Sequence, residues 1–166
     1  MSAPYSLEPL SSRHDRTRFD CGVEPLNTYL RTRVAQDMRR RLTACFVAVD
    51  QATGHLAGYY TLAQSGIPLD EIDDLARRKL PRYPLMPATR LGRLAVDRHH
   101  RSKGLGGALL FDAIERVTRS EIPAYAMVVD AKDAAAIAFY RHHGFLPFES
   151  VPNTLYLPLT RSAPAG

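Results

Sequence analysis

The sequence predicts an α/β (α+β) fold in which a mixed central sheet of six to seven strands is flanked by about four helices. Three observations predict it. Short apolar runs are bounded by turn residues, two segments show the periodicity of amphipathic helices, and a glycine-rich loop joins a buried strand to a helix. The chain has 166 residues, of which 45% are hydrophobic, and this suits a single globular domain over residues 1–166.

The first part of the chain predicts an edge strand, a helix and a hairpin. Residues 5–10 form the edge strand, where a proline is tolerated. A helix follows over residues 24–40, because its apolar side chains recur at helical spacing and a proline fits its first turn. Strands at residues 44–49 and 55–63 flank a short segment typical of a hairpin turn. Gly58 indicates either a β-bulge or the close approach of a ligand, and we favour the bulge.

The middle of the chain predicts a long connection and then a strand, a loop and a helix. Residues 65–88 contain several prolines and one short helix over 70–79, and so long a connection in a compact domain is usually functional. A buried strand follows at residues 91–97. After the loop, an amphipathic helix presents one apolar stripe, made of Leu105, Leu109, Leu110, Ala113, Ile114 and Val117.

The last part of the chain predicts a buried strand at residues 124–129, a short helix and two further strands. Asp133 can cap a helix over residues 134–142, and Gly144 can end it in a left-handed turn. Phe145 restarts a strand. Residues 155–159 then close the sheet, and the residues from about 161 form a frayed tail.

The composition predicts a cytoplasmic protein that does not enter a membrane. No stretch approaches the roughly 20 apolar residues of a membrane helix, and the first residues lack the basic and apolar regions of a signal peptide. Cys21 and Cys45 have no metal-site or disulfide spacing, which indicates buried thiols in a reducing compartment. The six histidines do not cluster at ligand spacings, so we expect no metal.

The most informative segment is the glycine-rich loop, residues 101–107, with its pattern Arg101-x-x-Gly104-x-Gly106. It leads into the N-terminus of a helix, where unpaired backbone N–H groups and the helix dipole favour a phosphate ester. Glycines let the backbone approach the anion closely. The pattern is neither that of a nucleotide triphosphatase loop nor that of a dinucleotide-binding fold.

Together with a second motif, Ala136-x-x-x-Tyr140-x-x-x-Gly144-Phe145, this loop resembles the GCN5-related N-acetyltransferase (GNAT) superfamily. The resemblance implies a GNAT fold, acetyl-CoA as co-substrate, and Tyr140 as the acid that protonates the departing thiolate. It also implies that the Val96 N–H polarises the thioester carbonyl. Many members have asparagine where this chain has Asp133, so we expect Asp133 to cap the helix instead. The implied cofactor-binding residues are Leu94, Ala95, Val96, Arg101, Ser102, Lys103, Gly104, Leu105, Gly106, Gly107 and Tyr140.

A closer resemblance covers nearly the whole chain, from about residue 5 to residue 159. The segments Phe19–Leu30, Gly58–Leu62, Leu91–Val96, Val129–Lys132 and Phe139-Tyr140 together look like the tRNA-acetylating toxins of bacterial toxin–antitoxin systems. This resemblance implies that the enzyme acetylates the α-amine of aminoacyl-tRNA and so blocks translation. It also implies a homodimer and a ribbon-helix-helix antitoxin as partner.

Charge and chemistry agree with that substrate. The net charge is +5, and arginines gather in two runs, one in the first helix and one before the central strand. Each run alone is typical of a solvated surface. An α-amine with a pKa of about 8, lowered further by an adjacent ester, needs little help from a base. The candidates for binding the tRNA backbone are Arg33, Arg77, Arg78, Arg90 and Arg93, although Arg90 and Arg93 have internal ion pairs as an alternative.

Two other functions fit the same motifs. The first is an acetyltransferase that acts on a small-molecule amine or a protein N-terminus, with the same co-substrate and the same role for Tyr140. The second is a noncatalytic, acyl-CoA-sensing module, which the presence of both the glycine-rich loop and Tyr140 disfavours.

Overall fold

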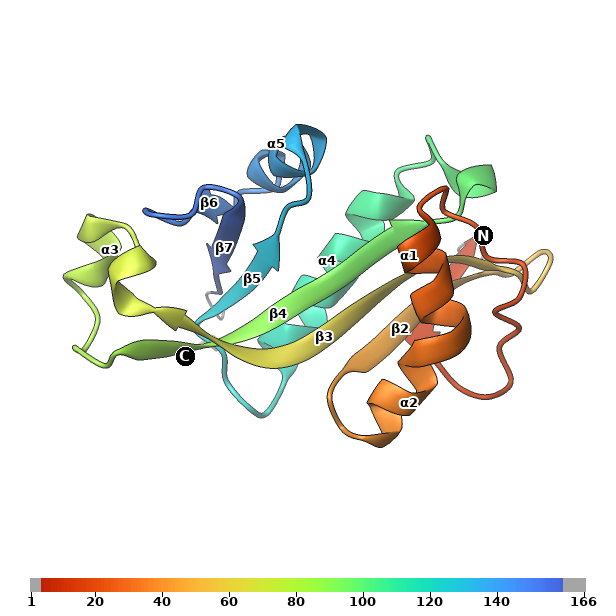
Figure 1. Ribbon diagram of the computed structural model, residues 1–166, viewed down its shortest axis with the longest axis horizontal. Helices are drawn as coiled ribbons and strands as arrows, with labels where there is room; N and C mark the ends of the chain where they lie inside the picture. The colour runs from red at the N-terminus through yellow and green to blue at the C-terminus, as the bar shows by residue number, and fades with distance from the viewer. Residues whose placement is uncertain (1–3, 160–166) are drawn as a thin grey trace, which may run out of the picture. The chain divides into compact units, whose positions relative to one another are not determined.

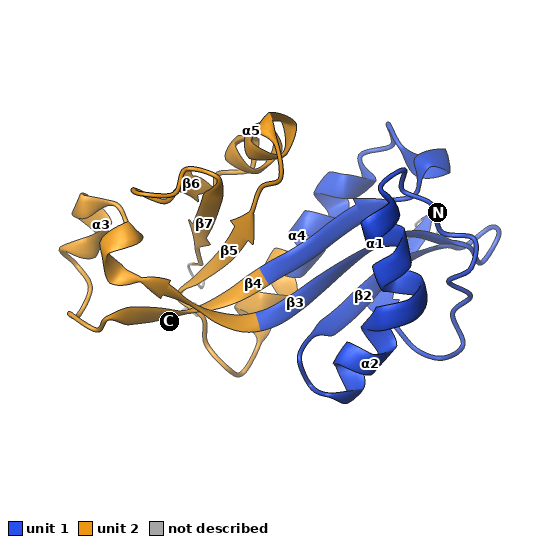
Figure 2. Cartoon of the chain, in the orientation of Figure 1, with its two compact units in different colours: residues 1–63, 91–113 blue, residues 64–90, 114–166 orange. Residues whose placement is uncertain are grey.

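The computed structural model describes residues 4–159. The tail expected from about residue 161 lies outside the described residues. The chain divides into two compact units (Figure 2), one made of Met1–Ala63 with Leu91–Ala113 and the other of Gln64–Arg90 with Ile114–Gly166. The expectation of a single domain stays a prediction, and each unit is described by itself below.

Seven strands form one sheet in the order β1-β2-β3-β4-β5-β7-β6 (Figure 1). The strands are β1 (Tyr5–Pro9), β2 (Ala44–Asp50), β3 (Leu56–Pro68), β4 (Leu85–Val96), β5 (Ala126–Asp130), β6 (Leu146–Pro147) and β7 (Thr154–Pro158). The helices are α1 (Glu24–Thr28), α2 (Val34–Arg39), α3 (Asp74–Arg77), α4 (Leu105–Arg119) and α5 (Ala134–His142). The neighbouring strands β4 and β5 are connected through α4, the crossover that a parallel pair requires. The predicted α/β fold class is confirmed.

In the first unit, β1 pairs antiparallel with β2, and β2 pairs antiparallel with β3. The register of β2 on β3 shifts between Ala48 and Val49, opposite Gly58, so the predicted bulge is confirmed. Gly58 also lets α4 pack closely, because a Cβ there would lie 2.8 Å from Cδ1 of Leu109 and 2.9 Å from the carbonyl oxygen of Ala95. The close approach at this glycine is therefore that of α4 and of the β4 backbone.

The predicted helix over residues 24–40 contains a π-helical turn at Tyr29–Arg33 between α1 and α2. In this turn the Val34 N–H donates to the carbonyl of Tyr29, one residue further back than in an α-helix. The Leu30 carbonyl accepts a hydrogen bond of 3.0 Å from the Arg16 guanidinium. The sequence pattern missed this turn because the apolar spacing alone fits an uninterrupted helix.

In the second unit, the predicted long connection over residues 65–88 is wrong at both ends. Strand β3 continues to Pro68 and β4 begins at Leu85, so only a short 3₁₀ turn and α3 lie between them. The reason is nonlocal: Ile67, Met86 and Ala88 are buried in one apolar cluster of this unit. Burial against distant residues thus outweighs the prolines, which read locally as loop signals.

The helix and glycine turn near the end of the chain were predicted correctly. Asp133 caps α5 by accepting a hydrogen bond of 2.8 Å from the Ala136 N–H, and Gly144 follows the helix with φ +94°. The segment expected to close the sheet, residues 155–159, falls on β7, which is not an edge strand: β7 pairs with both β5 and β6, and β6 lies at the edge. Strand β7 reaches this place by antiparallel pairing along β5, whose first four residues are buried.

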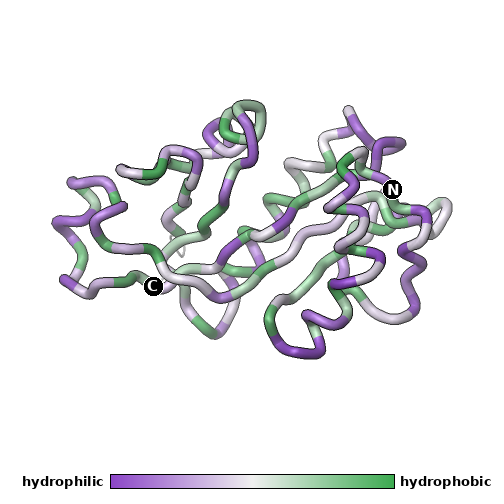
Figure 3. The backbone as a smooth tube through the Cα atoms, viewed as in Figure 1, coloured by the Kyte–Doolittle hydropathy of each residue, from purple (hydrophilic) through white to green (hydrophobic). Residues whose placement is uncertain are grey.

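Several expectations from composition can be compared with the described part of the chain. Within residues 4–159, no helix is long and apolar enough to cross a membrane. Cys21 and Cys45 are both free thiols and buried, as predicted. Among the same residues, no group of three potential metal ligands occurs. Hydrophilic residues gather at the end of α2 and in the turn before α4 (Figure 3).

Candidate active site

The glycine-rich loop connects β4 to α4 through a 3₁₀ turn at Arg98–His100. Two residues of the loop have left-handed backbone conformations, Ser102 with φ 64° and Gly104 with φ 74°. A Cβ at Gly104 would meet nothing within 4 Å, so the backbone is open to an approaching ligand at this point. The first N–H groups of α4 have no partner within the helix, which makes the loop suitable for a diphosphate.

The last residues of β4 have the arrangement that a strand-like ligand arm needs. The Asp97 N–H donates to the Ala57 carbonyl on β3 at 2.8 Å. Because backbone groups alternate along a strand, the N–H groups of Leu94 and Val96 point away from β3. The side chains of Leu94 and Val96 are half-buried, whereas Ala95 is buried in the core of the first unit. The Val96 N–H thus lies on the side of β4 opposite β3.

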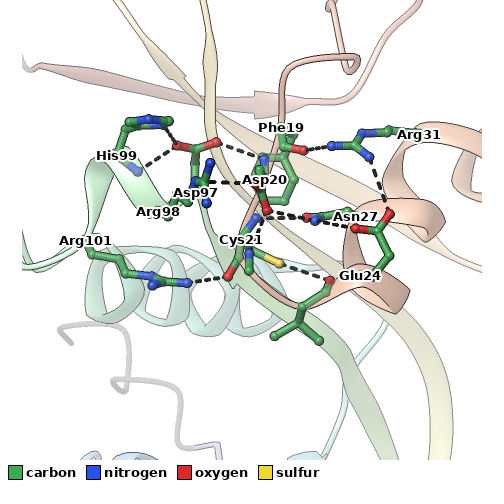
Figure 4. A network of polar contacts seen from close by, with 12 residues as sticks. Phe19, Asp20, Cys21, Glu24, Asn27, Arg31, Asp97, Arg98, His99 and Arg101 are labelled. Carbon is green, nitrogen blue, oxygen red and sulfur yellow. Dashed lines mark hydrogen bonds and ion pairs between the residues drawn. The ribbon is translucent and has the colours of Figure 1, made fainter.

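Asp97 is a buried carboxylate that sequence reasoning missed as a site residue. Its Oδ2 accepts from the Asp20 N–H at 3.0 Å, and its Oδ1 accepts from the His99 N–H at 2.9 Å (Figure 4). Burial would raise the pKa of Asp97, but these hydrogen bonds and His99 outweigh it and hold the pKa below its usual value. Asp97 is therefore ionised at neutral pH, directly before the 3₁₀ turn.

The residues that Asp97 contacts form the Asp20 loop, defined as residues 19–22. Asn27 on α1 is 1% exposed and fixes this loop, because its Oδ1 accepts from the Cys21 N–H at 2.8 Å and its Nδ2 donates to Asp20 Oδ1 at 3.0 Å. Arg101 donates from its guanidinium to the Cys21 carbonyl (Figure 4). The signal that could have found this network was the polar Asp20-to-Asn27 stretch inside an otherwise apolar helix start.

Tyr140 lies near the C-terminal end of α5 and is 9% exposed. Its ring packs against Phe145, with ring centroids 5.3 Å apart, and its carbonyl accepts from the Phe145 N–H at 3.1 Å. Within residues 4–159 its hydroxyl has no hydrogen-bond partner. Burial raises the pKa of Tyr140 to about 12, so the phenol is fully protonated at neutral pH. The side chain can donate a proton but is a poor base.

Four of the five arginines considered for tRNA binding already have partners within the protein. Arg77 and Arg78 each form a 2.9 Å ion pair with Asp74 of α3. Arg90 forms an ion pair with Asp130. The sequence predicted either an internal ion pair or tRNA binding for Arg90, and the structure shows the ion pair.

The other two predicted arginines belong to the first unit. The guanidinium carbon of Arg93 lies 3.4 Å from the centroid of the Tyr29 ring, a cation–π contact. Arg33, in the π-helical turn, is exposed and makes no ion pair or side-chain hydrogen bond with residues 4–159. It is therefore the predicted arginine most available to a phosphate.

Comparison with known proteins adds a family and an activity to this geometry. The model of the acetyltransferase (GNAT) family matches residues 12–145. A "tRNA-acetylating toxin" of Mycobacterium tuberculosis is 35% identical over 147 residues, which cover 87% of this chain and 86% of that protein.

Two solved structures have the same fold over nearly their whole length. AtaT complexed with acetyl-methionyl-tRNAfMet has a TM-score of 0.87 and 28% identity, covering 93% of this chain and 94% of that one. A tyrosine-to-phenylalanine variant of AtaT, bound to the C-terminus of the antitoxin AtaR and to acetyl-CoA, has a TM-score of 0.78 and 26% identity. It covers 95% of this chain and 94% of that one.

Proposed function

Because the chain belongs to the acetyltransferase (GNAT) family, we propose that it moves the acetyl group of acetyl-CoA to the α-amine of an aminoacyl-tRNA and thereby blocks translation. The observation that carries this proposal is the 35% identity, over most of both chains, to a tRNA-acetylating toxin. AtaT, whose fold this chain shares, has been seen with an acetylated methionyl-tRNA. The enzyme is thus an acetyltransferase with acetyl-CoA as co-substrate, and it acts in the cytoplasm, where its substrate occurs.

The glycine-rich loop and the end of β4 fit acetyl-CoA. The open backbone at Gly104 and the first N–H groups of α4 would bind the diphosphate, with Lys103 exposed beside them. Leu94 and Val96 would bind the pantetheine arm through backbone groups that point away from β3. The cofactor-binding residues remain those expected from the family motif, and Ala95 contributes backbone only, because its side chain is buried in the core.

The proposed mechanism uses two groups of the protein, the Val96 N–H and the Tyr140 hydroxyl. The α-amine of an aminoacyl ester is largely neutral at cytoplasmic pH and attacks the thioester carbonyl directly. The Val96 N–H polarises that carbonyl, a contribution of a few kcal/mol for a well-oriented donor. The C–S bond then breaks, and the protonated Tyr140 hydroxyl supplies the proton that the departing sulfur takes up. The attacking nitrogen releases one proton to water, and water returns a proton to Tyr140.

The tRNA backbone is assigned to Arg33 and to its exposed neighbours Arg39, Arg40 and Arg41 at the end of α2. These arginines have no ion pairs with residues 4–159, unlike Arg77, Arg78 and Arg90. Arg77, Arg78, Arg90 and Arg93 contribute only if an RNA phosphate displaces their present partners. A binding surface of this kind loses affinity steeply as salt concentration rises.

We further propose two partners. AtaT binds the C-terminus of the antitoxin AtaR, and a corresponding antitoxin of the ribbon-helix-helix type would neutralise this enzyme. The enzyme itself would form a homodimer, which light scattering would detect as twice the mass of one chain. Growth arrest on expression of this chain alone, relieved by co-expression of the adjacent gene, would support the first proposal, and arrest that the neighbour leaves unchanged would contradict it.

The decisive experiment compares acceptors. Purified enzyme is incubated with labelled acetyl-CoA and, in separate reactions, with aminoacyl-tRNA, uncharged tRNA, polyamines and peptides with free N-termini. We expect label only on aminoacyl-tRNA, and transfer at least about 100-fold slower with the Tyr140→Phe variant. Label on polyamines or peptides alone would instead establish the small-amine or protein N-terminus activity. Coenzyme A binding without transfer to any acceptor would establish a sensing module.

A further inference from the structure

The turn before α4 is fastened to the Asp20 loop by contacts from three different residues. Asp97 accepts the Asp20 N–H at 3.0 Å. The Arg98 N–H donates to the Asp20 carbonyl at 2.9 Å, and the Arg98 Nε lies 3.3 Å from Asp20 Oδ2. Arg101 donates to the Cys21 carbonyl. All of these residues belong to the first unit, and Figure 4 shows them converging on the Asp20 loop.

The Arg101 side chain lies against the backbone of the Asp20 loop. Gly22 has φ +82°, and a Cβ there would come within 2.8 Å of the Arg101 Nη2. The left-handed backbone favours glycine at this position, and an added Cβ would also displace the end of the Arg101 side chain. The contact with the Cys21 carbonyl holds the Nη2 end of the guanidinium against the Asp20 loop.

The loop that follows needs such support. Ser102 has φ 64°, a conformation that costs a residue with a Cβ about 1–2 kcal/mol and persists only where surrounding contacts enforce it. Asp97 and Arg101 both precede this strained segment in the sequence. Both oxygens of Asp97 are occupied, and its side chain is almost fully buried, so it provides a rigid attachment point.

We propose that Asp97 and Arg101 are positioning residues, which hold the glycine-rich loop in its anion-accepting conformation by fastening it to the Asp20 loop, and that the Arg101 side chain does not bind the diphosphate itself. This inference rests on the proposed use of acetyl-CoA and changes the role of Arg101 within it. Only the backbone of residue 101 then takes part in binding. Asn27 extends the same attachment to α1, because it holds the Asp20 loop from the other side.

The test compares two substitutions of Arg101 in calorimetric titrations with coenzyme A. Arg101→Lys keeps the positive charge but lacks the planar fork, and Arg101→Met removes the charge. A positioning role predicts that both variants bind coenzyme A about tenfold more weakly, the effect of losing one hydrogen bond with a charged partner. Arg119→Lys and Arg119→Met are matched controls, because Arg119 lies on α4, is exposed and, among residues 4–159, forms an ion pair with Glu115 alone. Both control variants should bind within about twofold of wild type.

Two further measurements separate positioning from direct binding and from loss of folding. In Arg101→Met, the dependence of affinity on salt should have the same slope as in wild type, since no ion pair to the ligand is lost. Asp97→Asn should also weaken coenzyme A binding about tenfold. The asparagine amide would place an NH2 donor against the N–H of Asp20 or His99, where the carboxylate accepts a hydrogen bond. The double variant Asp97→Asn/Arg101→Met should lose less affinity than the product of the two single losses, since both substitutions act on one loop. In each single variant, the KM for acetyl-CoA should rise by about tenfold, and kcat should fall by a smaller factor than KM rises.

Several outcomes would overturn the inference. Affinity retained in Arg101→Lys but lost in Arg101→Met, or a shallower salt dependence in Arg101→Met, would show that the charge itself contacts the diphosphate. Wild-type affinity in both variants, or fully multiplicative effects of Asp97→Asn and Arg101→Met, would remove the shared positioning role. The titration of the wild-type protein is done first. If the wild type does not bind coenzyme A at all, the proposed function itself is refuted.

Discussion

Replacing Tyr140 with phenylalanine tests the proposed acid directly, because the substitution removes one hydroxyl and little else. The hydroxyl has no hydrogen-bond partner within residues 4–159, so its loss leaves no buried donor or acceptor unpaired there. The ring contact with Phe145 remains possible in the variant. We therefore expect Tyr140→Phe to fold, with an unfolding free energy within about 1 kcal/mol of wild type near neutral pH.

The expected loss of activity follows from the protonation state. With a pKa of about 12, Tyr140 is protonated in essentially every molecule at neutral pH. Removing a positioned proton donor costs about 100- to 10,000-fold in rate, which corresponds to about 2.7–5.4 kcal/mol in the barrier. Acetyl-CoA affinity should stay within about twofold, because the diphosphate and pantetheine contacts lie elsewhere in the sequence. For the same reason, ionisation of Tyr140 should not reduce wild-type activity until the pH exceeds about 11.

The assay is single-turnover transfer of labelled acetyl to aminoacyl-tRNA, paired with titration calorimetry for acetyl-CoA. Tyr83→Phe is the matched control, because Tyr83 is 63% exposed and belongs to the same unit. A Tyr140→Phe variant that transfers acetyl at the wild-type rate would refute the acid assignment. A decline of wild-type kcat between about pH 8 and 10 that persists in the variant would show that another group limits the reaction there.

Three further predictions concern stability. Gly58→Ala should destabilise the protein by about 2 kcal/mol and lower its melting temperature by about 6 °C, since the new Cβ would meet Leu109 and a backbone oxygen; calorimetry showing an unchanged melting temperature would contradict this packing. Asp133→Ala should cost about 1 kcal/mol in urea unfolding, whereas Asp133→Asn keeps the capping oxygen and should cost a few tenths; equal losses would mean that the cap is not the cause. The pKa of Tyr140 is raised in the folded state, so its contribution to stability is complete below about pH 10, where the unfolded phenol is still protonated, and is lost as pH rises toward 12. Between about pH 9 and 11, wild type should therefore lose about 1.4 kcal/mol more unfolding free energy than Tyr140→Phe, and parallel losses in urea titrations would show that Tyr140 does not titrate in this way.

The sequence by itself determined the features that depend on neighbouring residues. Helix α5, its cap at Asp133 and its glycine turn at Gly144 were predicted to the residue, because caps and left-handed turns are local interactions. The apolar stripe of α4 was predicted for the same reason, since its spacing is that of a helix facing a core. The family motifs supplied the candidate residues of the active site, and their roles stay predictions until the variants are measured.

The tertiary structure alone decided what depends on distant residues. The ends of β3 and β4 and the place of β7 between β5 and β6 follow from burial and strand pairing that no local window contains. The π-helical turn is likewise invisible in the apolar pattern.

The arginines show this difference most clearly. Arg90 pairs with Asp130, 40 residues away, and Arg101 contacts Cys21, 80 residues away. A cation in a sequence has a charge but no partner, and only the folded chain decides whether that charge is used inside the protein or remains available to a phosphate.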